Sequence, residues 1–288
     1  MYSMALVYRH RTLQKVANFA MKVDRIGEYP KPINAVHDGY TYRRSFRSWF
    51  INESGGRHKL ANNSMVILFT GYNFRSNDLR ITNSKTQGLA YVETSCNWIY
   101  TNDSRMAEPC ILVEARSYRA VFIAAHELGH TLGMYHDEGA TQTVKCGKNH
   151  IMSETTGSGK VTWSHCSQQY LNRYIIEANK PVKDCLFKND HAQSSSASSS
   201  SYSSVIQFPD DPDISPAVRD PRNYMSTSVD LQCQTALGLH FKYYRKSKFN
   251  ICNQYIVCTN GMVNIDIGPA IENTTCGVNR YCIEGKCD

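Results

Sequence analysis

Several features are scarce or missing from this sequence, and each absence excludes a class of protein. No run of about 18 uncharged apolar residues occurs, so no segment is long enough to cross a bilayer as a helix. No Cys-x-x-Cys pair is present, which weighs against zinc ribbons. The net charge is +7, but no recognised nucleic-acid-binding module accompanies it, so a nucleic-acid partner is not expected. No internal repeat divides the 288 residues.

Cysteine, in contrast, is abundant. Of the eleven cysteines, five lie between residues 96 and 185 and six lie between residues 233 and 287. The density of the second group is typical of small extracellular scaffolds that bury too little apolar surface to fold without disulfides. Four Asn-x-Ser/Thr sequons fit a secretory route and a glycoprotein; they begin at Asn52, Asn62, Asn102 and Asn273.

The N-terminal residues do not by themselves provide that route. The sequence MYSMALVYRHRTLQK has only about five apolar residues in a row before Arg9, too few for the core of a signal peptide. We therefore expect that Met1 is not the natural start and that the chain is a fragment of a secreted protein.

A basic run, Lys242 to Lys248 (KYYRKSK), stands among tyrosines in the cysteine-dense part. One interpretation is a solvated basic face. The other is contact with a glycosaminoglycan or another acidic surface.

The order of sequence patterns predicts two folded parts joined by a linker. Periodicity in the first part predicts helices over 11–23, 43–51, 117–132 and 167–177, and strands over 64–74 and 88–96. Residues 191–204 are a serine-rich stretch without apolar periodicity, and a proline-punctuated segment follows it to Pro216. The expected boundaries are therefore 1–190 for the larger domain, 191–216 for the linker and 217–288 for the cysteine-dense module.

The chemistry is concentrated in one helix. His126 and His130 are four residues apart, so they lie one turn apart on the same helix face and both imidazoles can reach one metal ion. A catalytic zinc keeps three protein ligands and one open position. His136 can supply the third ligand if the chain leaves the helix at Gly133 and turns back. Glu127, next to the first ligand, is then the expected general base, which takes a proton from zinc-bound water.

The longer pattern HExxHxxGxxHD, from His126 to Asp137, resembles the signature of the metzincin metallopeptidases, and its aspartate points to the adamalysin, or reprolysin, branch. Residues 274–287 (TTCGVNRYCIEGKC) are similar to the disintegrin-like, cysteine-rich segment of the ADAMTS-like subgroup. Further matching segments are ILFTG (67–71), GLAYVETSC (88–96), CILVE (110–114), HIMS (150–153), WSHCS (163–167) and DCLF (184–187).

The resemblance implies an α/β (α+β) fold: a metzincin-type catalytic domain with a mixed sheet and an active-site helix, then a small disulfide-rich, disintegrin-like module. The catalytic domain is expected to be N-terminally incomplete, because the opening strand and the prodomain of the family are not recognisable. Met152 would be the methionine of the Met-turn beneath the zinc ligands, and the residues after it would wall the specificity pocket opposite Gly133. An extended substrate would bind along an edge strand formed by Gly88, Leu89, Ala90, Tyr91 and Val92.

The resemblance also bears on cysteines and on a second metal. It implies the disulfides Cys96–Cys185 and Cys146–Cys166, whereas the relatives pair Cys110 with a cysteine upstream of Cys96 that this chain lacks. Asn73 and Lys188 stand where relatives have calcium ligands. A lysine cannot ligate calcium, which weighs against a structural Ca²⁺ ion.

These observations predict a secreted zinc metalloendopeptidase with one catalytic Zn²⁺ ion and extracellular proteins or peptides as substrates. An alternative is a cell- or matrix-binding protein with a vestigial protease domain, and a zinc hydrolase of non-peptide substrates is a third. The presence of Glu127 and of all three histidines argues against a vestige, and the edge-strand segment favours peptides. The cysteine-rich module could contact matrix or cell surfaces, but it has no Arg-Gly-Asp tripeptide for integrins.

Overall fold

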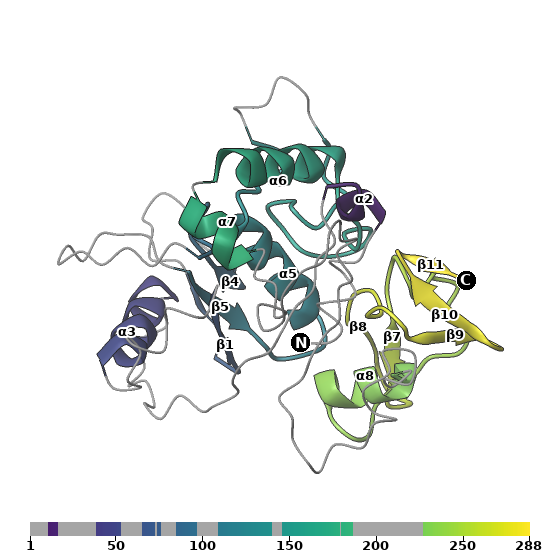
Figure 1. Ribbon diagram of the computed structural model, residues 1–288. Coiled ribbons are helices and arrows are strands. Elements are labelled where there is room, and N and C mark those ends of the chain that lie inside the picture. The colour runs from purple at the N-terminus through teal and green to yellow at the C-terminus, as the bar shows by residue number, and fades with distance from the viewer. Residues whose placement is uncertain are drawn as a thin grey trace, which may run out of the picture.

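The computed structural model places a larger mixed part beside a small cysteine-rich module (Figure 1). We use "larger part" for the described residues up to 186 and "module" for residues 227–288. The structure describes residues 11–16, 39–52, 65–72, 74–75, 85–96, 109–139, 146–178, 180–186 and 227–288. Among these residues, no helix is long and apolar enough to cross a membrane.

A mixed three-stranded sheet forms the centre of the larger part. Strand β5 (Cys110–Glu114) lies in the middle, with β1 (Val66–Thr70) parallel to it on one side and β4 (Gly88–Leu89) antiparallel on the other. β5 is buried along almost its whole length, as its apolar sequence CILVE predicts for a central strand. Among the described strands, β1 and β4 are therefore the two edges of this sheet.

Helices cover both faces of this sheet. Ile111 and Val113 point toward α5 (Ala120–Thr131) and belong to the main core, whereas Leu112 points the other way and packs with Tyr42 of α3 (Gly39–Asn52). Figure 1 shows α3 and α5 on opposite sides of the sheet. The remaining elements of the larger part are α2 (Arg11–Gln14), α6 (His165–Glu177), α7 (Lys180–Leu186) and a hairpin of β2 (Phe74–Arg75) with β3 (Lys85–Thr86).

The predicted α/β (α+β) class, with a mixed sheet and a helix that carries the HExxH motif, is confirmed, and most predicted elements are present within a few residues. The strand predicted over 88–96 is the exception, because only Gly88 and Leu89 pair with a neighbour. Beyond them the backbone turns, with positive φ at Glu93 and Cys96. The amides of Glu93 and Ser95 donate to the carbonyls of His130 and Thr131, so this segment is held by the end of α5 instead of by a strand.

Two other predictions fall partly outside the described residues. The helix predicted over 11–23 is present only as α2, which is followed by a turn at residues 15–16, and residues 17–38 are not described. The strand predicted over 64–74 is β1, which ends at Thr70, and Phe74 belongs to β2 of a separate hairpin. The predicted linker, 191–216, lies entirely outside the described residues, so the domain boundaries remain a prediction.

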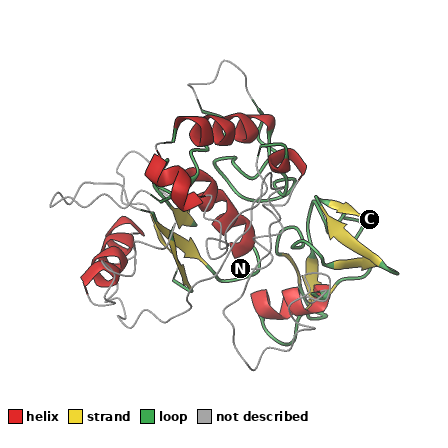
Figure 2. Ribbon diagram, in the orientation of Figure 1, coloured by secondary structure: helices red, strands yellow, loops and turns green. Residues whose placement is uncertain are grey.

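The module contains one helix, α8 (Val229–Leu237), and two small sheets. One sheet has the order β6 (Lys242–Tyr243), β7 (Val257–Thr259), β8 (Asn264–Asp266), and the other has β9 (Thr275–Gly277), β10 (Arg280–Ile283), β11 (Lys286–Cys287). Figure 2 shows how short its strands are. Three disulfides cross-link these elements: Cys233–Cys258, Cys252–Cys282 and Cys276–Cys287.

The module packs directly against the larger part. Ile271 of the module belongs to the main apolar core together with residues of α5 and α6. The backbone amide of Gly159 donates a hydrogen bond of 2.7 Å to the carbonyl of Asn253. The two parts therefore share a buried surface, and the loop around Gly159, which follows Met152 in the sequence, lies at it.

Candidate metal centre

Helix α5 is the central element of the site, and its sequence explains its burial. Ten of its twelve residues are buried. The helix has mostly apolar side chains of its own on all faces, which is typical of a helix inside a core. His126 and Glu127 are among the buried residues, and His130 lies one turn after His126 on the same helix. An apolar helix that nevertheless buries two ionisable side chains indicates a site whose polar groups have a specific partner.

The chain leaves α5 as the glycine pattern predicted. Gly133 has φ +83°, a left-handed conformation that glycine adopts without strain. The amide of Gly133 donates to the carbonyl of His130, and that of Met134 donates to the carbonyl of Gly129, which closes the helix end. A side chain at Gly133 would also collide with Tyr174, at 2.8 Å from its Cβ. This turn brings His136 back over the helix.

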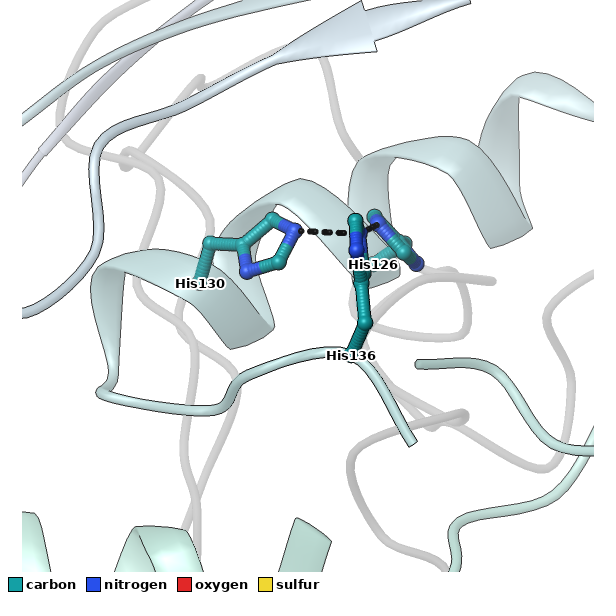
Figure 3. Close-up of side chains that lie close together, drawn as sticks. All are labelled: His126, His130 and His136. Carbon is teal, nitrogen blue, oxygen red and sulfur yellow. Dashed lines mark hydrogen bonds between the residues drawn. The ribbon is translucent and has the colours of Figure 1, made fainter. Parts of the chain in front are cut away.

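The three imidazoles converge on one point (Figure 3). The Nε2 atom of His136 lies 3.2 Å from the Nε2 atoms of both His126 and His130. Ligand nitrogens at the usual zinc bond length and a tetrahedral angle are separated by about 3.3 Å. These side chains therefore have the spacing that a single zinc ion requires.

Two of the rings are also held in the tautomer that a metal needs. His126 donates through Nδ1 to the carbonyl of Ile151 at 2.7 Å, and His130 donates through Nδ1 to the carbonyl of Met134 at 2.8 Å. Each hydrogen bond leaves the Nε2 lone pair directed at the common point.

Electrostatics favours neutral rings. Burial lowers the pKa of His126 to about 4 and that of His130 to about 3, and it lowers the pKa of His136 as well. Neutral imidazoles do not have to lose a proton before they bind a metal, so the site is poised for a cation near neutral pH.

The side chain of Glu127 extends from α5 toward the edge strand β4. A Cβ atom added at Gly88 would come within 2.5 Å of Glu127 Oε1, so only glycine leaves room for this carboxylate against β4. Burial raises the pKa of Glu127 to about 8, and the positive charge of Arg43 acts against that shift. A bound divalent cation would act in the same direction as Arg43 and favour the ionised carboxylate.

Met152 lies directly beneath the helix. The side chain is fully buried, and its Sδ atom would be 2.6 Å from a Cβ atom added at Gly129, which stands between the first two histidines in the helix. A glycine inside a helix costs about 1 kcal/mol relative to alanine. Here it lets the methionine approach the backbone that carries the histidines.

Asp137 organises the loop instead of joining the imidazoles. Its carboxylate accepts a 2.5 Å hydrogen bond from the hydroxyl of Ser164, the residue that caps the start of α6. Its amide donates to the carbonyl of Met152. Asp137 thereby ties the segment after His136 both to the Met152 turn and to α6.

Disulfides brace the site from two directions. Cys96–Cys185 joins the end of the 88–96 segment to α7, and Cys146–Cys166 joins the loop before Met152 to α6. These are the two pairs that the resemblance implied. Together with those of the module, the five disulfides use ten of the eleven cysteines, and Cys110 is buried on β5. The close sulfurs of Cys252, Cys276 and Cys287 all belong to disulfides, which agrees with the expectation of disulfides instead of a zinc ribbon in this module.

Comparison with known proteins agrees with this geometry. The sequence profile of the reprolysin (M12B) family zinc metalloproteases matches residues 45–190, just over half of the chain. The chain belongs to the reprolysin family. A second profile, that of ADAMTS cysteine-rich domain 2, matches residues 225–288. The predicted enzyme class, a zinc metalloendopeptidase of the ADAMTS-like subgroup, is thus confirmed at the level of the family.

The curated relatives to which this reprolysin chain is similar are named as disintegrin and metalloproteinase proteins with thrombospondin motifs. Over 77% of its length the chain is 28% identical to "A disintegrin and metalloproteinase with thrombospondin motifs adt-1" of Caenorhabditis elegans, and over 88% it is 24% identical to human "A disintegrin and metalloproteinase with thrombospondin motifs 7". Over 98% it is 24% identical to the mouse protein with number 19. The chain spans only 13% to 22% of the length of these relatives.

Some features of the reprolysin site were missed by sequence reasoning. The need for glycine at position 88 and the buried position of Arg43 both arise from packing between distant segments, and no local pattern signals them. The hydrogen bond from Ser164 to Asp137 could have been suspected from the capping serine in WSHCS. Asn73 and Lys188, which weighed against calcium, lie outside the described residues.

Proposed function

We propose that the chain is a secreted zinc-dependent endopeptidase that hydrolyses peptide bonds of extracellular proteins. The observation that carries this proposal is the convergence of three neutral imidazoles: His136 Nε2 lies 3.2 Å from the Nε2 atoms of His126 and His130. These two histidines belong to the helix whose Glu127 lies against an edge strand. One catalytic zinc ion would be held by His126, His130 and His136.

The roles of the protein groups follow from their positions. When bound, zinc lowers the pKa of water to about 7 and polarises a carbonyl group. Glu127 accepts the proton of the attacking water and passes it to the leaving amine. The backbone carbonyls of Ile151 and Met134 keep two imidazoles oriented throughout. Met152 supports the helix from below.

An extended peptide would bind along Gly88 to Val92. Among the described strands, β4 pairs only with β5, so its outer edge can accept a peptide by β-strand addition. The main-chain hydrogen bonds would position the scissile bond above the imidazoles, and the residues after Met152 would wall the specificity pocket opposite Gly133.

An extracellular location is supported by the five disulfides, which persist in oxidising compartments. We propose a catalytic domain over 1–190, a linker over 191–216 and a disintegrin-like module over 217–288. The module would provide contact with matrix or cell surfaces.

The test is incubation of the full chain with a diverse peptide library, with and without a metal chelator, followed by sequencing of the cut sites. We expect internal cuts that the chelator abolishes and that added zinc restores. Absence of any chelator-sensitive cleavage by folded, zinc-loaded protein would contradict the proposal and favour a binding protein with a vestigial protease domain.

A further inference from the structure

Arg43 is a cation buried next to the edge strand. It belongs to α3 and is only 6% exposed, whereas the next residue of the helix, Arg44, is exposed. Burial of an arginine is uncommon, because removing its charge from water costs free energy unless an anion or hydrogen-bond acceptors compensate. We therefore expect an anion or a set of hydrogen-bond acceptors to lie next to the Arg43 guanidinium.

The protein itself supplies only part of that compensation. The guanidinium carbon of Arg43 lies 3.7 Å from the centroid of the Tyr91 ring, which is close enough for a cation–π interaction. The Nε atom is buried without a hydrogen-bond partner. No ion pair involving Arg43 is found among the residues that the structure describes.

The carboxylates that flank the edge strand in the described chain form no ion pair with Arg43. Glu93 accepts a 2.9 Å hydrogen bond from Arg173. Glu114 lies 3.8 Å from Arg116, and its Oε2 atom is itself buried without a hydrogen-bond partner. Glu127 feels the charge of Arg43, but it packs against Gly88 and is needed for the reaction. The guanidinium thus forms no ion pair with a described carboxylate, although it lies close enough to Glu127 for the two charges to interact.

The alternation of the edge segment places Arg43 on a definite side. Leu89 packs toward α3 with Tyr42 and Phe74, whereas Gly88 faces Glu127 of α5. Tyr91, two residues after Leu89, likewise meets Arg43 of α3. A peptide strand beside this segment would direct alternate side chains to the same two sides.

We propose that Arg43, with Tyr91, determines specificity by binding the carboxylate of an acidic side chain in a peptide that lies along Gly88 to Val92. The inference rests on the proposed function and deepens it. Tyr91 is 39% exposed, so a peptide can reach the ring that Arg43 contacts. A carboxylate there would complete the arginine's hydrogen bonds and would point away from the pocket expected beside Met152.

The experiment compares peptide pairs that differ only by Glu or Gln at successive positions around the cut. For the wild-type chain we expect kcat/KM to favour Glu about ten- to a hundredfold at one position or at alternate positions, the range for a hydrogen bond to a charged group. Arg43→Met keeps the apolar bulk over Tyr91 and should reduce this ratio to near one. Arg44→Ala, on the exposed side of the same helix, should leave it unchanged.

Two results would overturn the inference while the proposed function stands. One is chelator-sensitive cleavage by the wild type with equal rates for Glu and Gln at every position. The other is an equal loss for all peptides in Arg43→Met, which would show that Arg43 supports Tyr91 or the charge of Glu127 without selecting the peptide. Equilibrium binding of the same peptides to the zinc-loaded Glu127→Gln variant gives the ratio without turnover, so a ratio near one there overturns the inference even if the chain cleaves nothing.

Discussion

The larger part and the cysteine-rich module reach a stable fold by different means. In the larger part, nineteen buried apolar residues form one continuous core, of which Ile271 is contributed by the module. In the module, four of the seven buried residues of the core are cysteines, all in disulfides. The larger part can therefore bury polar side chains such as His126 and Glu127 inside an apolar core. The module buries too few apolar residues to be stable by its core alone and depends on its disulfides.

Reduction of the disulfides should separate the stability of the module from that of the larger part most clearly. Each disulfide stabilises a small domain by about 2–4 kcal/mol, and a core of this size supplies only about 3–5 kcal/mol, so loss of three disulfides should unfold the module. Hydrogen exchange in a phosphine reductant should show β7 and β10 losing protection while β5 and α5 keep it. Simultaneous opening of α5 and β10 would contradict independent sources of stability.

Loss of the proposed general base, Glu127, should have the next largest effect, and this effect should be confined to the larger part. Glu127→Gln keeps the shape of the side chain and removes the proton acceptor, so the rate should fall by about 10²–10⁴-fold. Steady-state cleavage of a peptide from the library measures this loss. A rate within a few-fold of wild type would exclude Glu127 as the base.

The close approach of Gly88 to Glu127 allows a finer test of the same site. In Gly88→Ala the new Cβ would lie within 2.5 Å of Glu127 Oε1, so the carboxylate must move, and a shift of this kind can cost about 10²-fold in rate. Gly71→Ala is the matched control, since nothing lies within 4 Å of its added Cβ. Equal activities of the two variants would show that β4 does not constrain Glu127.

The sequence predicted what local spacing determines. Two histidines four apart require only a helix, and a glycine at position 133 requires only a turn with positive φ, so the convergence of the imidazoles could be anticipated. The end of β4 after Leu89 could not, because it depends on hydrogen bonds from Glu93 to the distant end of α5. Arg43 escaped notice because an arginine in an amphipathic helix is ordinarily solvated.

A substitution at the surface shared by the two parts should have the smallest effect, a modest loss of stability. Ile271 is a module residue in the core of the larger part, so Ile271→Val should lower the free energy of unfolding by about 0.5–1.5 kcal/mol. Thermal denaturation should show the loss in the transition of the larger part. Ile265→Val, at an exposed position of the module, is the control and should leave that transition in place.

The central claim is that three histidines hold one zinc ion and that Glu127 acts beside it without holding it. Its most direct test is the zinc content of purified full-length chains, measured by plasma mass spectrometry for the wild type, Glu127→Gln and His136→Ala. We predict about one zinc per chain in the first two and a clear deficit in His136→Ala, because removal of a ligand weakens the site. Wild-type zinc content in His136→Ala, or loss of zinc in Glu127→Gln, would contradict this account of the site.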